Sequence, residues 1–129
     1  MAQLQEICMN ILREEGYIPS IDEDGDIRFK MQGLTLYVMT DKDDPMFLRI
    51  ILPKFWEIES DEEFAKVHFV ANKMNTEYKV GKVFIANNNT TAACELFISE
   101  NDPEFKTIFL RILNLLTHLR VSFVSAMKE

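Results

Sequence analysis

The chain has 129 residues, 47% of them hydrophobic and 27% charged, and its formal net charge at pH 7 is −7. This length predicts one domain, residues 1–129, large enough to bury a core without the help of a disulfide or a metal. The acidic balance argues against nucleic-acid binding, because a negative surface repels phosphate backbones.

The first 15 residues have no basic region and no uninterrupted apolar run, so they do not form a signal peptide. No window approaches the roughly 18 apolar residues of a membrane span. Cys8 and Cys94 lie far apart and outside any CxxC motif, which is typical of reduced, buried thiols. We therefore expect a cytoplasmic protein that does not contact a membrane.

A first helix is expected over residues 3–15, where apolar side chains recur at helical spacing and Gly16 is placed to end it. The period then changes to two. Residues 17–21 predict a short strand, and the proline within it favours a position at the sheet edge. Residues 27–31 and 34–38 alternate apolar and polar side chains, which predicts a hairpin.

Residues 46–52, MFLRIIL, are apolar at nearly every position, as expected of a strand covered on both faces. A second helix is predicted over residues 60–76, because it opens with a capping box. A second hairpin follows, with strands at 79–86 and 92–99 joined by an asparagine-rich turn. The last helix, predicted over about residues 101–128, is the longest and very apolar.

Hairpins dominate over strand–helix–strand crossovers in this order of elements. Short hairpin connections predict antiparallel strands, and amphipathic helices must then pack on the sheet. The predicted fold class is α+β, in the order helix, several strands, helix, two strands, helix, with an antiparallel sheet.

The stretch IDEDGDIRF, residues 21–29, gathers four carboxylates around Gly25. A calcium loop with Gly25 at its sixth position would need a glutamate at the twelfth, where Met31 stands. A turn needs only the pair Asp24-Gly25 between two extended runs, which is a strong hairpin signal. We therefore predict a turn and no metal site.

No catalytic site is predicted. The other acidic clusters, at 41–44, 57–63 and 100–104, fall in turns or at helix starts, where carboxylates are stabilising without any catalytic role. His68 and His118 lie on predicted helices with no second ligand at metal spacing. The sequence contains no phosphate-binding loop and no nucleophile motif. We therefore expect no enzyme activity and no cofactor.

Apolar side chains that the core does not need are a better guide to function. On the second face of the predicted sheet, aromatic and apolar residues stand beside charged ones: Tyr37, Met39, Phe84 and Phe97 with Arg28, Lys30, Lys82 and Glu95. A solvated face does not need three aromatic side chains and a methionine. Either the protein's own helices or a polypeptide partner covers them, and the sequence leaves both alternatives open.

The predicted helices carry surplus apolar residues too. Leu110 and Val121 fall opposite the core-facing stripe of the last helix, and Phe69 does the same on the second helix. These residues are either scattered exposed apolar side chains, which are common, or contacts with a partner or a second copy of the chain.

Four segments together resemble the YbjN family of bacterial sensory transduction regulators: GYIPSIDEDGDIRFKMQGLTLYV, FLRIILP, VHFVANKMNTEYKVGKVFIA and LFISENDPEFKTIFLRILNLL. The resemblance spans about residues 4–126 and depends on element order, a D-G-D-hydrophobic-x-F hairpin and Asn75 near the end of the middle helix. It implies the element order α-β-β-β-α-β-β-α with a twisted antiparallel sheet, a fold similar to type III secretion chaperones. Proteins of that fold hold an extended partner segment in apolar grooves, often as dimers. It implies no catalytic residues.

These observations lead to two hypotheses of function. The first is a non-enzymatic protein-binding module, a regulatory adaptor or chaperone-like protein that holds a polypeptide partner on the second sheet face. A homodimer through the middle or last helix is compatible with it. The second hypothesis is a small-ligand sensor, or an unrecognised enzyme, with a pocket between the last helix and the sheet.

Overall fold

The computed structural model describes residues 3–129, which form three helices and one six-stranded sheet. The fold class is α+β, as the sequence predicts. In chain order the elements are α1 (Gln3–Glu14), β1 (Ser20–Ile21), β2 (Ile27–Met31), β3 (Leu34–Asp41), β4 (Asp44–Glu57), α2 (Asp61–Glu77), β5 (Gly81–Ala86), β6 (Asn89–Phe97) and α3 (Phe105–Met127). The two-residue strand β1 lies within the short strand expected at 17–21.

The strands are arranged in the order β1-β2-β3-β4-β6-β5, and every neighbouring pair is antiparallel. The strand β4, which is central, has 14 residues and continues past the end expected at residue 52. Pro53 does not terminate it, because the ladder with β6 becomes irregular directly after Pro53 and Lys54 adopts a φ of 56°. Such an irregularity accommodates the missing N–H of a proline.

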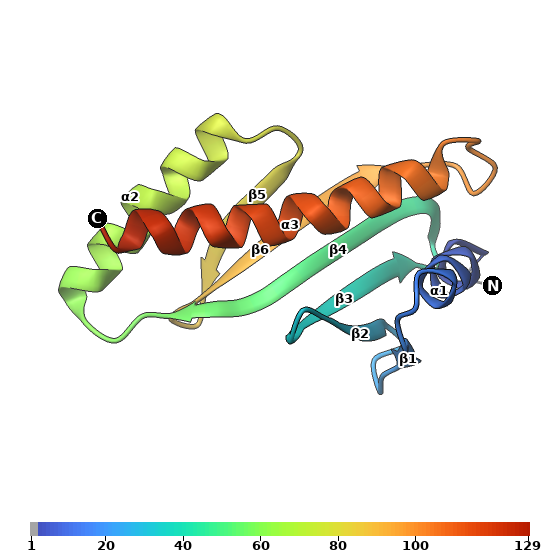
Figure 1. Ribbon diagram of the computed structural model, residues 1–129, viewed down its shortest axis with the longest axis horizontal. Helices are drawn as coiled ribbons and strands as arrows, with labels where there is room; N and C mark the ends of the chain where they lie inside the picture. Colours follow the sequence, from blue (N-terminus) through green and yellow to red (C-terminus); the bar gives the residue numbers. More distant parts are fainter. Residues whose placement is uncertain (1–2) are drawn as a thin grey trace.

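The helices cover one face of the sheet. In Figure 1, α3 runs across β4, β5 and β6, α2 packs beside it against β5, and α1 lies at the other end against β3 and β4. The strand residues that face the helices are buried because they alternate with outward-facing ones. They include Ile27, Phe29, Leu36, Val38, Leu48, Ile50, Leu52, Val83, Ala92 and Cys94.

Turn chemistry explains the hairpin between β5 and β6. Asn87 and Asn88 both have positive φ, 52° and 58°, as expected for the asparagine-rich turn. The strand β6 begins at Asn89, three residues earlier than expected, because a two-residue turn leaves the following threonines free to pair. The last helix begins at Phe105 rather than 101, after a turn in which the Asp102 carboxylate accepts the Glu104 N–H.

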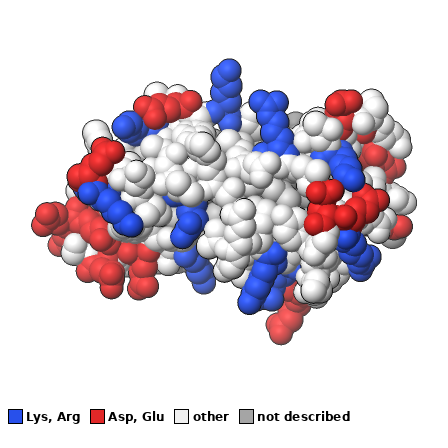
Figure 2. All heavy atoms as spheres, viewed as in Figure 1, with Lys and Arg blue, Asp and Glu red and all other residues white. Residues whose placement is uncertain are grey.

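Although no such segment was predicted from the sequence, the helix α3 is long enough and, with a mean hydropathy of 1.3, apolar enough to cross a membrane. Eight of its side chains are buried in the described part of the chain, and a core helix of a folded domain has the same composition. Figure 2 shows the helix-covered side of the molecule, with uncharged atoms in the centre. Acidic side chains gather at its left end, where α2 begins with Asp61, Glu62 and Glu63.

Candidate functional site

The sheet face turned away from the helices carries all four residues predicted to bind a partner. Tyr37 and Met39 lie on β3, Phe84 on β5 and Phe97 on β6. The strand register places Tyr37 opposite Ile51, and Phe47 of β4 opposite Phe97. We call this surface the open face and define it by Tyr37, Met39, Phe47, Ile51, Phe84 and Phe97.

No helix in residues 3–129 covers the open face. The hydrophobic core contains the helix-facing strand residues and none of the open-face residues. The exposed fraction of Phe97 is 74%, and Tyr37, Met39, Phe47 and Phe84 are half-buried among their strand neighbours, whereas Ile51 is buried, with 9% exposed. The alternative in which the protein's own helices cover these side chains is therefore wrong.

Sequence reasoning missed Phe47 and Ile51. The signal was present in the run MFLRIIL, but a continuous apolar run was interpreted as a strand covered on both faces. The helices cover only Leu48, Ile50 and Leu52. Phe47 instead makes an edge-on aromatic contact with Phe97 at 6.3 Å between ring centroids. The second apolar stripe of β4 thus belongs to the open face.

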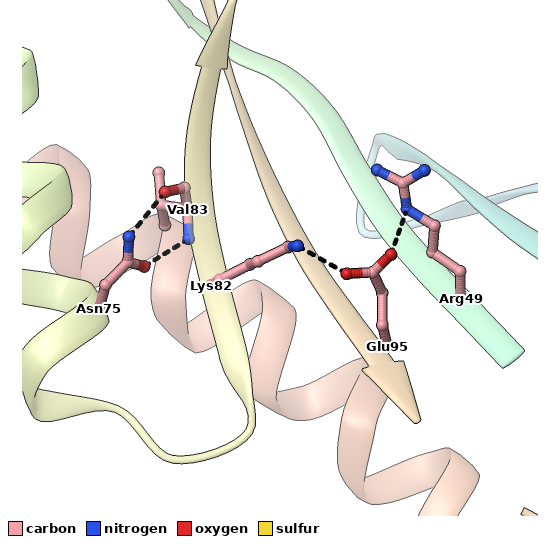
Figure 3. A network of polar contacts seen from close by, with 5 residues as sticks. All are labelled: Arg49, Asn75, Lys82, Val83 and Glu95. Atoms are coloured by element: carbon pink, nitrogen blue, oxygen red, sulfur yellow. Dashed lines mark hydrogen bonds and ion pairs between the residues drawn. The ribbon is translucent and has the colours of Figure 1, made fainter. Parts of the chain in front are cut away.

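A row of charges crosses the open face from β5 to β4. Lys82 Nζ lies 2.6 Å from one carboxylate oxygen of Glu95, and Arg49 Nε lies 3.5 Å from the other (Figure 3). The hydrogen bond from Lys82 is the main reason why the pKa of Glu95 lies below its usual value, with smaller contributions from the charges of Lys82 and Arg49. Both cations also approach the ring of Phe84, at 5.8 and 5.9 Å.

The open face is basic although the chain as a whole is acidic. Besides Arg49 and Lys82 it carries Arg28 and Lys30 on β2, both exposed and without an ion pair in the described part of the chain. Glu95 is the acidic residue among them. A surface that combines aromatic side chains with excess cations attracts groups that are apolar and negatively charged.

The predicted helix contacts are distributed differently. Phe69 is 72% exposed on α2, and Val121 is 59% exposed on α3. Leu110, by contrast, is half-buried and packs against the core, so its expected position opposite the core is wrong. Leu110 lies three residues before Leu113, which is buried, so the core-facing side of α3 is wider here than predicted.

A hollow of about 630 Å³ opens between α3 and the sheet. Its walls are Leu96 of β6, the segment Glu77–Val80 that joins α2 to β5, and four residues of α3: Ile108, Arg111, Ile112 and Leu115. This volume is typical of a small-molecule site, and the lining is mostly apolar. The hollow lies where the second hypothesis placed its pocket.

The acidic stretch forms a turn. One carboxylate oxygen of Asp22 accepts the N–H groups of Asp24 and Asp26, each at 2.9 Å, and Gly25 has a φ of 85°. Carboxylate oxygens of Asp22, Asp24 and Asp26 lie within 4.8 Å of one another, close enough to hold a cation. Burial, and then the charges of Asp22 and Asp24, raise the pKa of Asp26. The turn alone accounts for this geometry.

Both cysteines are free and buried, as the sequence predicts. Burial raises the pKa of Cys8 to about 12 and that of Cys94 to about 11, with a smaller effect of Glu95 on Cys94. Such thiols stay protonated and are poor nucleophiles.

The comparisons with known proteins define the fold alone. No family model matches the chain, and no curated protein is significantly similar to it. The structure is similar to the crystal structure of an uncharacterized protein from Methanothermobacter thermautotrophicus, with a TM-score of 0.59 and 14% sequence identity. The similarity covers 95% of this chain and 93% of that one. The chain thus has the fold of a one-sided antiparallel sheet that also occurs in an archaeal protein.

Proposed function

We propose that this chain is a non-enzymatic protein-binding module, a regulatory adaptor or chaperone-like protein that holds a polypeptide segment on the open face. The observation that carries the proposal is a sheet face, uncovered by any described helix, on which Phe97 is 74% exposed and in contact with Phe47. The same face carries Tyr37, Met39 and Phe84, which are half-buried. Exposed aromatic clusters of this kind are typical of interaction surfaces.

The charges of the open face favour a partner segment with both apolar and acidic side chains. Arg28 and Lys30 are available for carboxylates at one side of the face, and Arg49 and Lys82 flank Phe84 near the other. The formal net charge of the whole chain, −7, opposes a phosphate backbone, which supports a polypeptide over a nucleic acid. The sequence also resembles the YbjN family, whose implied fold is similar to that of type III secretion chaperones. Such chaperones hold an extended segment of a partner protein, which agrees with this proposal.

The decisive experiment compares two equally exposed phenylalanines. The tagged protein captures partners from a lysate of its own organism, and mass spectrometry identifies any protein retained in stoichiometric amount. We expect Phe97→Asp and Tyr37→Asp to abolish its capture, because each places a charge within the open face. Phe69→Asp makes the same change on α2, where the exposed fraction is 72%, and should leave capture intact.

Loss of capture in Phe69→Asp but not in Phe97→Asp would move the contact to the helices and contradict the assignment to the open face. The same pair of variants tests a homodimer through α2 or α3. Light scattering would then show a dimer that Phe69→Asp or Val121→Asp converts to a monomer while Phe97→Asp remains dimeric.

The hollow beside α3 favours a second candidate function, that of a small-ligand sensor. Its volume of about 630 Å³ and apolar walls suit a drug-sized molecule. A thermal-shift screen with metabolites tests this candidate. A compound that stabilises the wild-type protein but not Ile108→Trp would support a small-ligand sensor, and the absence of any shift across a broad panel would count against it.

A further inference from the structure

We infer that the end of β6, residues 95–97, accepts an extended segment of the partner as an added β-strand, with an aliphatic side chain of that segment inserted into the hollow under α3. This inference rests on the proposed function, because it specifies how a polypeptide partner would be held. It concerns the edge of the sheet, whereas the proposed function concerns the open face.

The first observation is that β6 continues beyond its neighbour β5. On one side β6 pairs with β4 as far as Phe97, which lies opposite Phe47. On the other side the pairing with β5 ends at Cys94, which lies opposite Gly81. Residues 95–97 are therefore paired on one side only within the described part of the chain.

The direction of the backbone groups follows from the ladder. The N–H and C=O of Val83 point away from β6, because both bind the side chain of Asn75. Backbone groups alternate along a strand, so the odd-numbered residues of β6 point toward β5 and the even-numbered ones toward β4. The bond from the Ile98 N–H to the Met46 carbonyl agrees with this alternation. Glu95 and Phe97 thus direct their N–H and C=O groups toward the vacant side.

Val80 is the residue that leaves this side vacant. Continuing the register would place Val80 opposite Glu95, yet Val80 has a φ of 72° and makes no backbone hydrogen bond to Glu95 within residues 3–129. A positive φ in a β-branched residue is strained and rare. The strained residue turns the α2–β5 connection away from β6 at the point where the ladder would have continued.

The hollow lies on the helix side of the same edge. Leu96, which points toward the helices, forms its floor, while Ile108 and Ile112 of α3 lie above it. A strand paired with residues 95–97 would direct alternate side chains into this hollow and toward exposed Phe97. Main-chain pairing combined with a pocket for alternate side chains is a general mode of peptide recognition.

The charges at this edge indicate the chemistry of the segment. Lys79 and Arg111 line the hollow, and neither forms an ion pair in the described part of the chain. Glu77 is the opposing charge there. The excess of cations favours a segment in which an aliphatic residue is flanked by acidic ones. A second copy of this chain and a free small molecule are the competing occupants.

The test uses a displayed library of random ten-residue peptides selected on the wild-type protein. We expect enriched peptides to carry an aliphatic residue with acidic neighbours and to slow amide exchange at Glu95 and Phe97. Phe97→Pro removes the outward N–H from an edge position, which tolerates proline, and should weaken these peptides about fivefold or more relative to Phe97→Ala. Ile108→Trp fills the hollow and should weaken them at least tenfold, whereas Thr107→Trp, on the exposed side of α3, should not.

Three results would overturn the inference. The first is that no peptide is enriched, and the second is that enriched peptides bind Phe97→Pro as tightly as Phe97→Ala and leave the amides of Glu95 and Phe97 unprotected. The third is that the free protein forms a dimer which Phe97→Pro dissociates. The Tyr37→Asp variant separates this inference from the proposed function. Peptides sensitive to Phe97→Pro but indifferent to Tyr37→Asp would support the edge site alone. The reverse pattern would support the open face and exclude strand addition.

Discussion

The side-chain amide of Asn75 binds both backbone groups of Val83. Its Nδ2 donates to the Val83 carbonyl at 3.0 Å and its Oδ1 accepts the Val83 N–H at 2.7 Å (Figure 3). Val83 lies in β5, which is the last strand of the sheet. One helix side chain thus takes the place of a further strand at that position, and an edge blocked in this way is protected against pairing with another chain.

Asn75→Ala should therefore lower the free energy of unfolding by about 1–3 kcal/mol, because it leaves two backbone groups of the sheet without partners. Urea denaturation measures the change. Asn72→Ala, one turn earlier on the exposed side of α2, is the matched control and should cost well under 1 kcal/mol. Equal losses in the two variants would show that the amide contact contributes nothing specific.

Glu95→Gln should make the stability of the protein less sensitive to acid. The pKa of Glu95 is lowered in the folded state, so its ionised form contributes stability above its usual pKa of 4.5, and that contribution is lost as the pH falls through the lower folded value. Because the group is solvent-exposed, the effect should stay below about 1 kcal/mol. Denaturation midpoints of both proteins between pH 7 and 3 measure it. If the midpoints of the two proteins fell in parallel as the pH is lowered, the ion pairs of Glu95 would contribute nothing to stability.

Cys8 and Cys94 should not react with a thiol reagent such as Ellman's reagent at pH 8 unless the protein unfolds, because both thiols are buried and their pKa values are about 12 and 11. Since these values lie above the unfolded value of 9.0, the neutral thiols contribute stability below pH 9 that is lost as the pH rises toward 11. The same reaction in denaturant should label both residues. Rapid labelling of the native protein would contradict their burial.

Gly81→Ala should destabilise the protein by about 1–3 kcal/mol through overpacking. An added Cβ would lie 2.8 Å from Leu119 Cδ1 and 3.2 Å from Leu115 Cδ2, and Leu119 is fully buried, so it has little room to move. Thermal unfolding measures the loss. In combination with Leu119→Ala, the glycine substitution should cost less than it does alone. If the losses of stability from Gly81→Ala and Leu119→Ala were additive, contact between the added Cβ and Leu119 would not be the cause.

Local sequence signals predicted much of the fold. The Ser60–Glu63 capping box is present, with the Glu63 N–H bound to Ser60 Oγ, and the asparagine turn has the positive φ angles that its residues favour. These features depend on neighbours in the chain, which a sequence displays directly. The order of elements followed from them.

The candidate sites depend on distant contacts, and the sequence showed less of them. Tyr37, Met39, Phe84 and Phe97 were placed on one face correctly by strand alternation, but whether a helix covered them depended on where α3 lay. From the sequence, Asn75 was named only as part of the family resemblance. Its role was not predicted, because its partner is the backbone of Val83, eight residues further along the chain. The free edge of β6 depends on the φ of Val80, and valine is a residue for which local preference predicts the opposite conformation.

A sheet that is covered on one side only has a consequence for evolution. Residues such as Phe47, Phe84 and Phe97 alternate with core residues along the same strands but do not enter the core. Substitutions among them can change the chemistry of the uncovered face while the scaffold stays intact. The scaffold itself tolerates extensive change in sequence, since an archaeal protein at 14% identity has a similar fold.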